Sequence, residues 1–244
     1  FSTFSDPLSI TTIGSANYFE LILPSTLDGG TYNALENAKY VFLNSQGASL
    51  TINDATINGG SSYPIYSYDA YSKLVINNAT VNATFGCINA YGTNGTVEIN
   101  GGTFQMTGVQ GKTSHIAYFS NVDAVINGGV YGTVFAWTHA VVEIYDAVID
   151  MLYCGTCDST THSWMTIGDG TVIEKIRCCE PRKPYGTKEY STTMTIKSGA
   201  KVGELELVST DVEFLIIESG ASVGKIVCDG VEYTYQELRE AMGL

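Results

Sequence analysis

Four stretches of this chain repeat one pattern: Leu50–Ile57 reads LTINDATI, Leu74–Val81 reads LVINNATV, Val97–Phe104 reads VEINGGTF and Ala124–Tyr131 reads AVINGGVY. In each, an isoleucine ends a short apolar alternation, and a second apolar residue follows a few positions later. Counting four later copies, eight anchor residues share the pattern: Ile52, Ile76, Ile99, Ile126, Ile144, Ile167, Ile196 and Ile217. Successive anchors are 24, 23, 27, 18, 23, 29 and 21 residues apart. Such a period, built from short β-patterned runs, is typical of a stacked solenoid.

Three apolar positions in each repeat predict three short strands in each coil. The residue two before the anchor is usually apolar, so that it faces the core together with the anchor. A second inward column is predicted at Ile57, Val81, Phe104, Tyr131, Ile149, Val172, Val202 and Val223. A third strand is predicted to begin at Ile65, Ile88, Ile116, Val134, Leu152, Ile176, Leu205 and Ile226. We therefore expect an all-β fold, a single-stranded parallel β-helix of about eight coils spanning residues 48–228.

An asparagine follows the anchor in the first four coils, at Asn53, Asn77, Asn100 and Asn127. Stacked asparagine amides can bond from coil to coil, so we expect a structural ladder there. With this ladder the chain resembles the right-handed parallel β-helix proteins of the pectate-lyase-like group, over roughly residues 48–230. A left-handed hexapeptide helix is the alternative, because one coil has only 18 residues and IKSGAKVG resembles a hexapeptide repeat. The irregular spacing favours the right-handed form.

Both ends of a solenoid need closing, because an open end exposes the core and unpaired strand edges. Residues 1–47 are predicted to form an N-terminal segment and cap, with a short helix and then a strand within Gly30–Asn44. Residues 229–244 are predicted to form a turn and a capping helix, which Thr234 and Glu237 begin as a capping box. Its core-facing side is expected to carry Tyr235, Leu238, Ala241 and Met242. This C-terminal sequence resembles the endings of repetitive appendage proteins of bacteriophages and gut bacteria.

The acidic composition of the chain argues against some classes of binding partner. Lys and Arg total 12 against 25 Asp and Glu, and the net charge of −13 argues against nucleic acid or an anionic membrane as a partner. No apolar run approaches the length that spans a membrane. The chain begins at Phe1, with neither Met nor a signal peptide, so we expect a processed or truncated product.

Two coils carry long insertions at the same corner, and these insertions hold four of the six cysteines. Cys154 and Cys178 should face inward one coil apart, at a separation that suits a disulfide. Cys157 and Cys179, in the adjoining loops, could form a second bridge. A zinc site made from the same cysteines with His162 is the alternative, and it is less favoured because adjacent cysteines point to opposite strand faces. We expect neither a bound metal nor a cofactor.

The outward face of the third strand carries aromatic residues in five successive coils. The predicted row is Tyr66, Tyr68, Tyr91, Phe119, Phe135, Trp137 and Tyr153. Contiguous apolar surface usually marks an interface, so we expect a subunit contact or carbohydrate stacking here. Cover by the chain's own N-terminal segment is the alternative. A register error of one residue would turn the row inward.

Catalysis finds little support in the sequence. Polysaccharide lyases and hydrolases need clustered carboxylates with an acid or base, or acidic calcium sites beside basic residues. Asp54, Asp146 and Asp169 share a corner position, but only the last two are stacked neighbours. The three histidines, His115, His139 and His162, are expected at different corners.

The sequence therefore predicts a noncatalytic structural or receptor-binding component of an extracellular assembly, most simply a phage virion appendage or decoration protein. Its partners would be further copies of the chain, a trimer among the options, other structural proteins of the assembly, or surface carbohydrate. A bacterial cell-surface adhesin is the first alternative. A polysaccharide lyase or glycoside hydrolase is the second.

Overall fold

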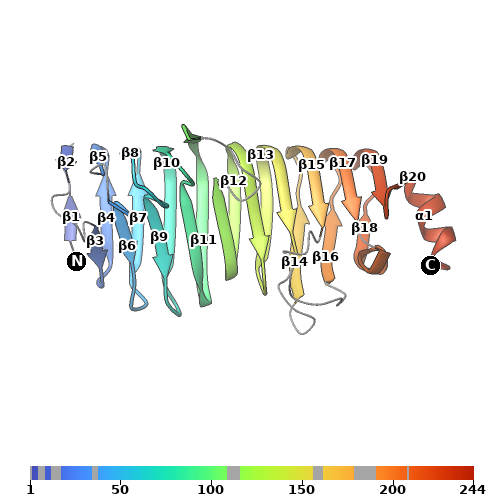
Figure 1. Ribbon diagram of the computed structural model, residues 1–244, viewed down its shortest axis with the longest axis horizontal. Helices are drawn as coiled ribbons and strands as arrows, with labels where there is room; N and C mark the ends of the chain where they lie inside the picture. Colours follow the sequence, from blue (N-terminus) through green and yellow to red (C-terminus); the bar gives the residue numbers. More distant parts are fainter. Residues whose placement is uncertain are drawn as a thin grey trace.

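The computed structural model describes residues 2–4, 9–11, 18–34, 38–108, 116–155, 162–178, 191–207 and 209–244. In Figure 1 the molecule is elongated, with strands side by side along its length and the two termini at opposite ends. The strands are β1 (Ser2–Phe4), β2 (Ser9–Thr11), β3 (Phe19–Leu21), β4 (Ser25–Asp28), β5 (Thr31–Asn33), β6 (Phe42–Asn44), β7 (Ser49–Asn53), β8 (Thr56–Asn58), β9 (Ile65–Tyr68), β10 (Lys73–Ala83), β11 (Ile88–Met106), β12 (Ala117–Trp137), β13 (Val141–Cys154), β14 (His162–Ile167), β15 (Val172–Cys178), β16 (Ser191–Ile196), β17 (Lys201–Leu207), β18 (Leu215–Ile217), β19 (Ser222–Cys228) and β20 (Val231–Tyr233). A 3-10 helix, η1 (Ser209–Phe214), and an α-helix, α1 (Tyr235–Ala241), complete the described elements.

The anchor isoleucines form one continuous register of parallel strands. Each anchor is the aligned partner of the next, from Ile52 in β7 to Ile217 in β18. The first seven are fully buried, and Ile217 in the last coil is partly exposed. The predicted all-β architecture with a long parallel sheet is thus confirmed, and its core is the stack of inward side chains.

The second column follows the prediction except in one coil. Ile149 of β13 aligns with Ile173 of β15, which is buried, and Ile173 aligns in turn with Val202 of β17. The prediction of Val172 as the inward residue is therefore wrong, and its side chain is 41% exposed. Two neighbouring β-branched residues fit either face, so the alternation alone could not choose between them.

The third column departs from the prediction in β12. Ile88 of β11 aligns with Ala117, so the strand begins one residue later than the predicted Ile116. Ile116 is still buried, and its carbonyl accepts hydrogen bonds from the N–H groups of Cys87 and Ile88. This shift of one residue exchanges the inward and outward side chains of the strand.

Two asparagine ladders fix the corners of the early coils. In the predicted ladder, the amide of Asn127 donates to Asn100, Asn100 to Asn77 and Asn77 to Asn53, over 2.9, 2.9 and 2.7 Å. A second ladder, which the sequence analysis missed, runs through Asn82, Asn58 and Asn33. These amides bond to one another, so their role in the fold is structural.

The N-terminal residues extend the sheet. Leu27 of β4 aligns with Ile52, and Tyr32 of β5 aligns with Ile57, both buried. The helix expected within Gly30–Asn44 is wrong for the described residues, because β5 and β6 lie there. The inward apolar residues of a further coil, Tyr32 and Phe42, explain these strands.

The C-terminal end closes with a hairpin and a helix. Asp229 and Gly230 form the turn that pairs β20 antiparallel to β19. Thr234 and Glu237 make the predicted capping box at the start of α1. Of the predicted helix face, Leu238 is buried and Tyr235 is half-buried, but Ala241 and Met242 are exposed because the helix leaves the last coil at its end. None of the helices in the described ranges is long and apolar enough to cross a membrane.

Candidate contact surface

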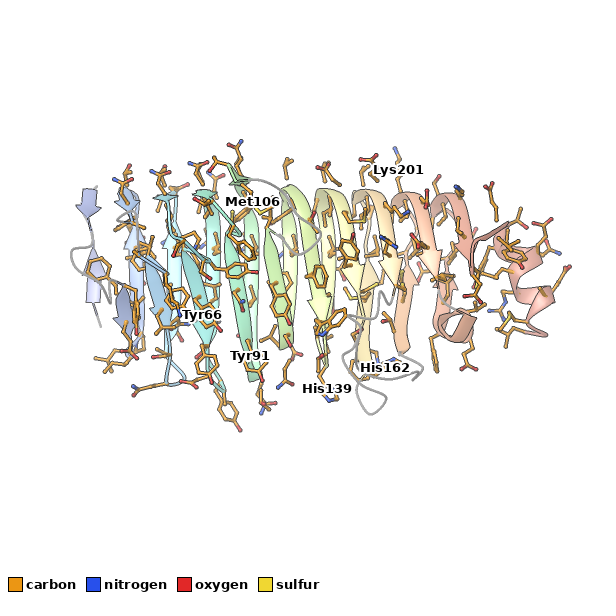
Figure 2. The ribbon with its side chains drawn as sticks, in the orientation of Figure 1. Tyr66, Tyr91, Met106, His139, His162 and Lys201 are labelled. Carbon is orange, nitrogen blue, oxygen red and sulfur yellow. The ribbon has the colours of Figure 1, made fainter. Side chains whose placement is uncertain are left out.

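The outward aromatic side chains lie on β9, β11, β12 and β13, as expected for six of the seven residues. Tyr66 aligns with Asn89 and Tyr68 with Tyr91 in the β9–β11 pair. Phe135 aligns with Tyr153 in the β12–β13 pair, and Trp137 follows Phe135 on the same strand face. Figure 2 labels Tyr66 and Tyr91 on these neighbouring strands.

Phe119 does not belong to this row. Its side chain is fully buried, because the later start of the third strand turns it into the core beside Ala90. Tyr118 points outward instead, and its ring stacks on that of Phe135 with centroids 6.2 Å apart. The surface therefore consists of Tyr66, Tyr68, Tyr91, Tyr118, Phe135, Trp137 and Tyr153, and we call it the aromatic face.

Rings of neighbouring coils stack on one another along the solenoid. Tyr68 and Tyr91 have centroids 5.9 Å apart and planes inclined by 14°, and Phe135 and Tyr153 have values of 4.8 Å and 25°. These separations are close to the spacing between coils, so each ring faces the ring of the next coil. One face of each of these four rings is thereby turned to the ring of a neighbouring coil. The ring edges and the tyrosine hydroxyls are what such stacking leaves for a partner.

The row continues beyond both predicted ends. On the N-terminal side, the ring of Tyr40 lies 4.7 Å from that of Tyr66, and Tyr18 lies 5.4 Å from Tyr40. On the C-terminal side, the guanidinium of Arg177 lies 5.8 Å from the ring centroid of Tyr153. Tyr18 and Tyr40 thus add rings beside the aromatic face, and Tyr68 and Tyr91 are 42% and 46% exposed.

The tyrosines around Tyr66 form one electrostatic group. Burial raises the pKa of Tyr66, and the neighbouring hydroxyls of Tyr40, Tyr68, Tyr118 and Tyr91 raise it further. The Tyr66 hydroxyl is therefore neutral at physiological pH and can both donate and accept hydrogen bonds.

Next to the aromatic face, β15, β17 and β19 carry a ladder of opposite charges that the sequence analysis missed. Lys175 Nζ lies 2.6 Å from Glu204 and 2.9 Å from Glu206, and Arg177 Nε lies 2.9 Å from Glu206. Lys225 continues the ladder at 3.7 Å from Glu204. All of these side chains are partly exposed, so their ion pairs contribute only modestly to stability. The aromatic face ends where these paired charges begin.

The inward cysteines lie where the sequence placed them. Cys154 of β13 aligns with Cys178 of β15, and their sulfur atoms are 3.2 Å apart. Cys157 and Cys179 lie outside the described residues. Cys228 is buried in the same column, beyond Leu207. Cys87 is buried elsewhere, and burial raises the pKa of its thiol to about 12, which makes it a poor nucleophile.

We expect Cys154 and Cys178 to form a disulfide when the protein matures in an oxidising setting, because their β-carbons lie on adjacent coils. Peptide mapping by mass spectrometry under nonreducing conditions checks this. The Cys154–Cys178 peptide pair should appear and disappear on reduction. Complete alkylation of both thiols in the unreduced, denatured protein would show that no bridge forms.

Asp146 and Asp169 lie at another corner of the solenoid, on neighbouring coils. The N–H of Asp146 donates to the carbonyl of Asp169, so these residues are neighbours as predicted, but Asp169 Oδ1 accepts from the N–H of Gly170 within its own turn. No group of three or more possible metal ligands occurs among the described residues.

Two histidines lie closer together than the sequence suggested. Figure 2 labels His139 and His162 near the same edge of the molecule. His162 Nε2 is 2.7 Å from Thr193 Oγ1, and burial lowers the pKa of His162, with the proximity of His139 as the second cause. The expectation that they lie at different corners is wrong. His115 lies outside the described residues.

No family model, no curated protein and no solved structure matches this chain.

Proposed function

We propose that this chain is a noncatalytic contact component of an extracellular assembly, a phage virion appendage or decoration protein in the form that we favour. The aromatic face is the observation that carries the proposal. It is continuous over neighbouring coils, and it belongs to a rigid sheet whose register is fixed by the core. Large rings held in this way lose little conformational entropy when a partner covers them.

The stacking geometry favours a protein partner over carbohydrate. A sugar ring packs against the open face of an aromatic ring, whereas most rings here turn their faces to the next coil. Ring edges and tyrosine hydroxyls suit the mixed apolar and polar contacts of a protein interface, where tyrosine and tryptophan are enriched. We infer further copies of the chain or other structural proteins of the assembly as the partner.

We also infer the finer architecture, a right-handed parallel β-helix of about eight coils like those of the pectate-lyase-like group. The support is the spacing of the aligned anchors, which ranges from 18 to 29 residues. A hexapeptide helix keeps a stricter period. The long insertions that follow Cys154 and Ile176 in the sequence break any strict period.

The double substitution Phe135→Ser and Trp137→Ser tests the proposed contact. We expect it to weaken assembly by at least about tenfold, because it removes two adjacent anchors of the face. Both side chains point away from the core, so the thermal unfolding temperature should change little. Association is measured by analytical ultracentrifugation of the chain and by reconstitution into the native assembly.

A matched control replaces Val148 and Val172, exposed residues on a different face, by Ser. This variant should assemble as the wild type does. Normal assembly of the folded aromatic variant would contradict the proposal. A variant that assembles normally but no longer binds a glycan array would instead favour the adhesin.

A further inference from the structure

The last coil of the solenoid leaves one strand edge open. β18 pairs with β16, and no described strand pairs with its other side, whereas β20 covers β19 from Ile226 to Cys228. The N–H of Glu218 donates to the carbonyl of Ile196 over 2.9 Å. Because backbone groups alternate along a strand, the N–H and carbonyl of Ile217 point away from β16, toward the open side.

The C-terminal cap seals only part of this edge. The hydroxyl of Tyr235 donates to the carbonyl of Leu215 over 3.0 Å, which satisfies that acceptor. Beyond it, Ile217 and Val223 remain partly exposed, although their partners one coil earlier, Ile196 and Val202, are 0% and 3% exposed. The core is therefore uncovered beside the free backbone groups of Ile217.

A groove of about 490 Å³ lies at this place, between the last coil and the cap at the red end of Figure 1. Its apolar floor consists of Ile217, Ala221, Val223 and Ile226. Its volume is in the range of sites that bind ligands.

The charged residues that line the groove are acidic. They are Glu232 and Glu237, and no basic residue is among the described residues that line it. Glu237 is engaged in the capping box through one carboxylate oxygen, and Glu232 lies 3.9 Å from Lys225 with a side chain that is 68% exposed. The chain as a whole carries a net charge of −13. A cationic partner is favoured by this field.

We propose that this groove binds an extended segment of a partner polypeptide, which adds a strand to the open edge of β18. One large apolar side chain of the segment would occupy the groove above Val223, and a flanking lysine or arginine would meet Glu232. Strand addition of this kind takes affinity from the backbone hydrogen bonds and specificity from the alternate side chains. The site lies apart from the aromatic face and does not depend on its function.

Two sets of short synthetic peptides test the site. Both have a central phenylalanine within alternating valine and threonine, and they end in lysines in one set and in glutamates in the other. We expect the lysine set to bind the full chain, and the glutamate set to bind at least about tenfold more weakly, in fluorescence anisotropy titrations. Hydrogen exchange of the Ile217 amide should slow on binding.

Matched variants separate the site from nonspecific binding. Val223→Phe fills the groove and should weaken binding by at least about tenfold, whereas Ser222→Phe places the same ring on the outward side and should not. Glu232→Lys leaves the core intact and should reverse the preference between the two sets. The double variant of Phe135 and Trp137 should bind the peptides normally.

Three results would overturn the proposal. One is the absence of binding by either set at about 1 mM peptide. Another is an unchanged affinity in folded Val223→Phe together with an unchanged preference in Glu232→Lys. The third is protection from exchange that appears on other strands and leaves Ile217 unaffected.

Discussion

Replacing Ile126 by Asp is expected to destabilise the fold by more than about 3 kcal/mol. Ile126 is fully buried, and its aligned neighbours on both sides, Ile99 and Ile144, are fully buried as well. A carboxylate at this position would be enclosed by aliphatic side chains with no cation to pair with. In a solenoid the damage reaches the interfaces with both adjoining coils. Chemical denaturation followed by circular dichroism measures the loss.

Val130→Asp is the control for this variant. Val130 lies four residues further along β12 and is 56% exposed, so the same charge meets water there. Its effect should stay within about 0.5 kcal/mol. Equal stability of the two variants would show that the anchor column does not form the core.

Replacing Gly102 by Ala is expected to cost about 3 kcal/mol, from backbone strain and a steric clash together. Its φ of +122° lies in a region that residues with a side chain rarely adopt. A β-carbon there would lie 2.4 Å from the carbonyl oxygen of Ala79, a backbone atom of the preceding coil. Relief would require the two coils to separate locally. The thermal unfolding temperature is the direct readout.

Gly101→Ala separates the effect of backbone strain from that of the steric clash. Gly101 also has a positive φ, of +79°, but a β-carbon there has no atom within 4 Å. This substitution should cost only the conformational strain, about 1 kcal/mol. If both variants lost the same stability, close stacking of the coils at this corner would not be the reason for the glycine.

The anchor column could be predicted because eight copies of one pattern share a phase, and each copy has to bury its isoleucine. The strand register within single coils was harder to predict than the anchor column. In β15, Val172 and Ile173 are equally suited to the core, and the turn before them decides which one enters. In β12, starting the strand at Ala117 instead of Ile116 exchanges Phe119 with Tyr118. Alternation has a period of two, so an error of one residue inverts a whole strand.

The sequence predicts most of the residues of the aromatic face, but it does not predict how their rings are oriented. Sequence gives the column in which a ring lies, but not whether the ring shows its face or its edge to solvent. That orientation follows from the spacing of the coils and the stacking of Tyr68 on Tyr91. The sequence did not predict that Tyr18 and Tyr40 extend the row, because the eight-copy pattern begins only after them, at Leu50. The groove beside β18 depends on how far the cap reaches, which no local pattern encodes.

Tyrosine-directed chemical labelling of the intact native assembly, compared with the isolated chain, tests the central claim most directly. Tyr68 and Tyr91 are about half exposed in the isolated chain and should react there. If the aromatic face is the contact surface, both should be protected in the assembly, whereas exposed Tyr71, at 69%, should serve as the internal reference that reacts in both states. Equal labelling of Tyr68 and Tyr91 in the two states would contradict the account.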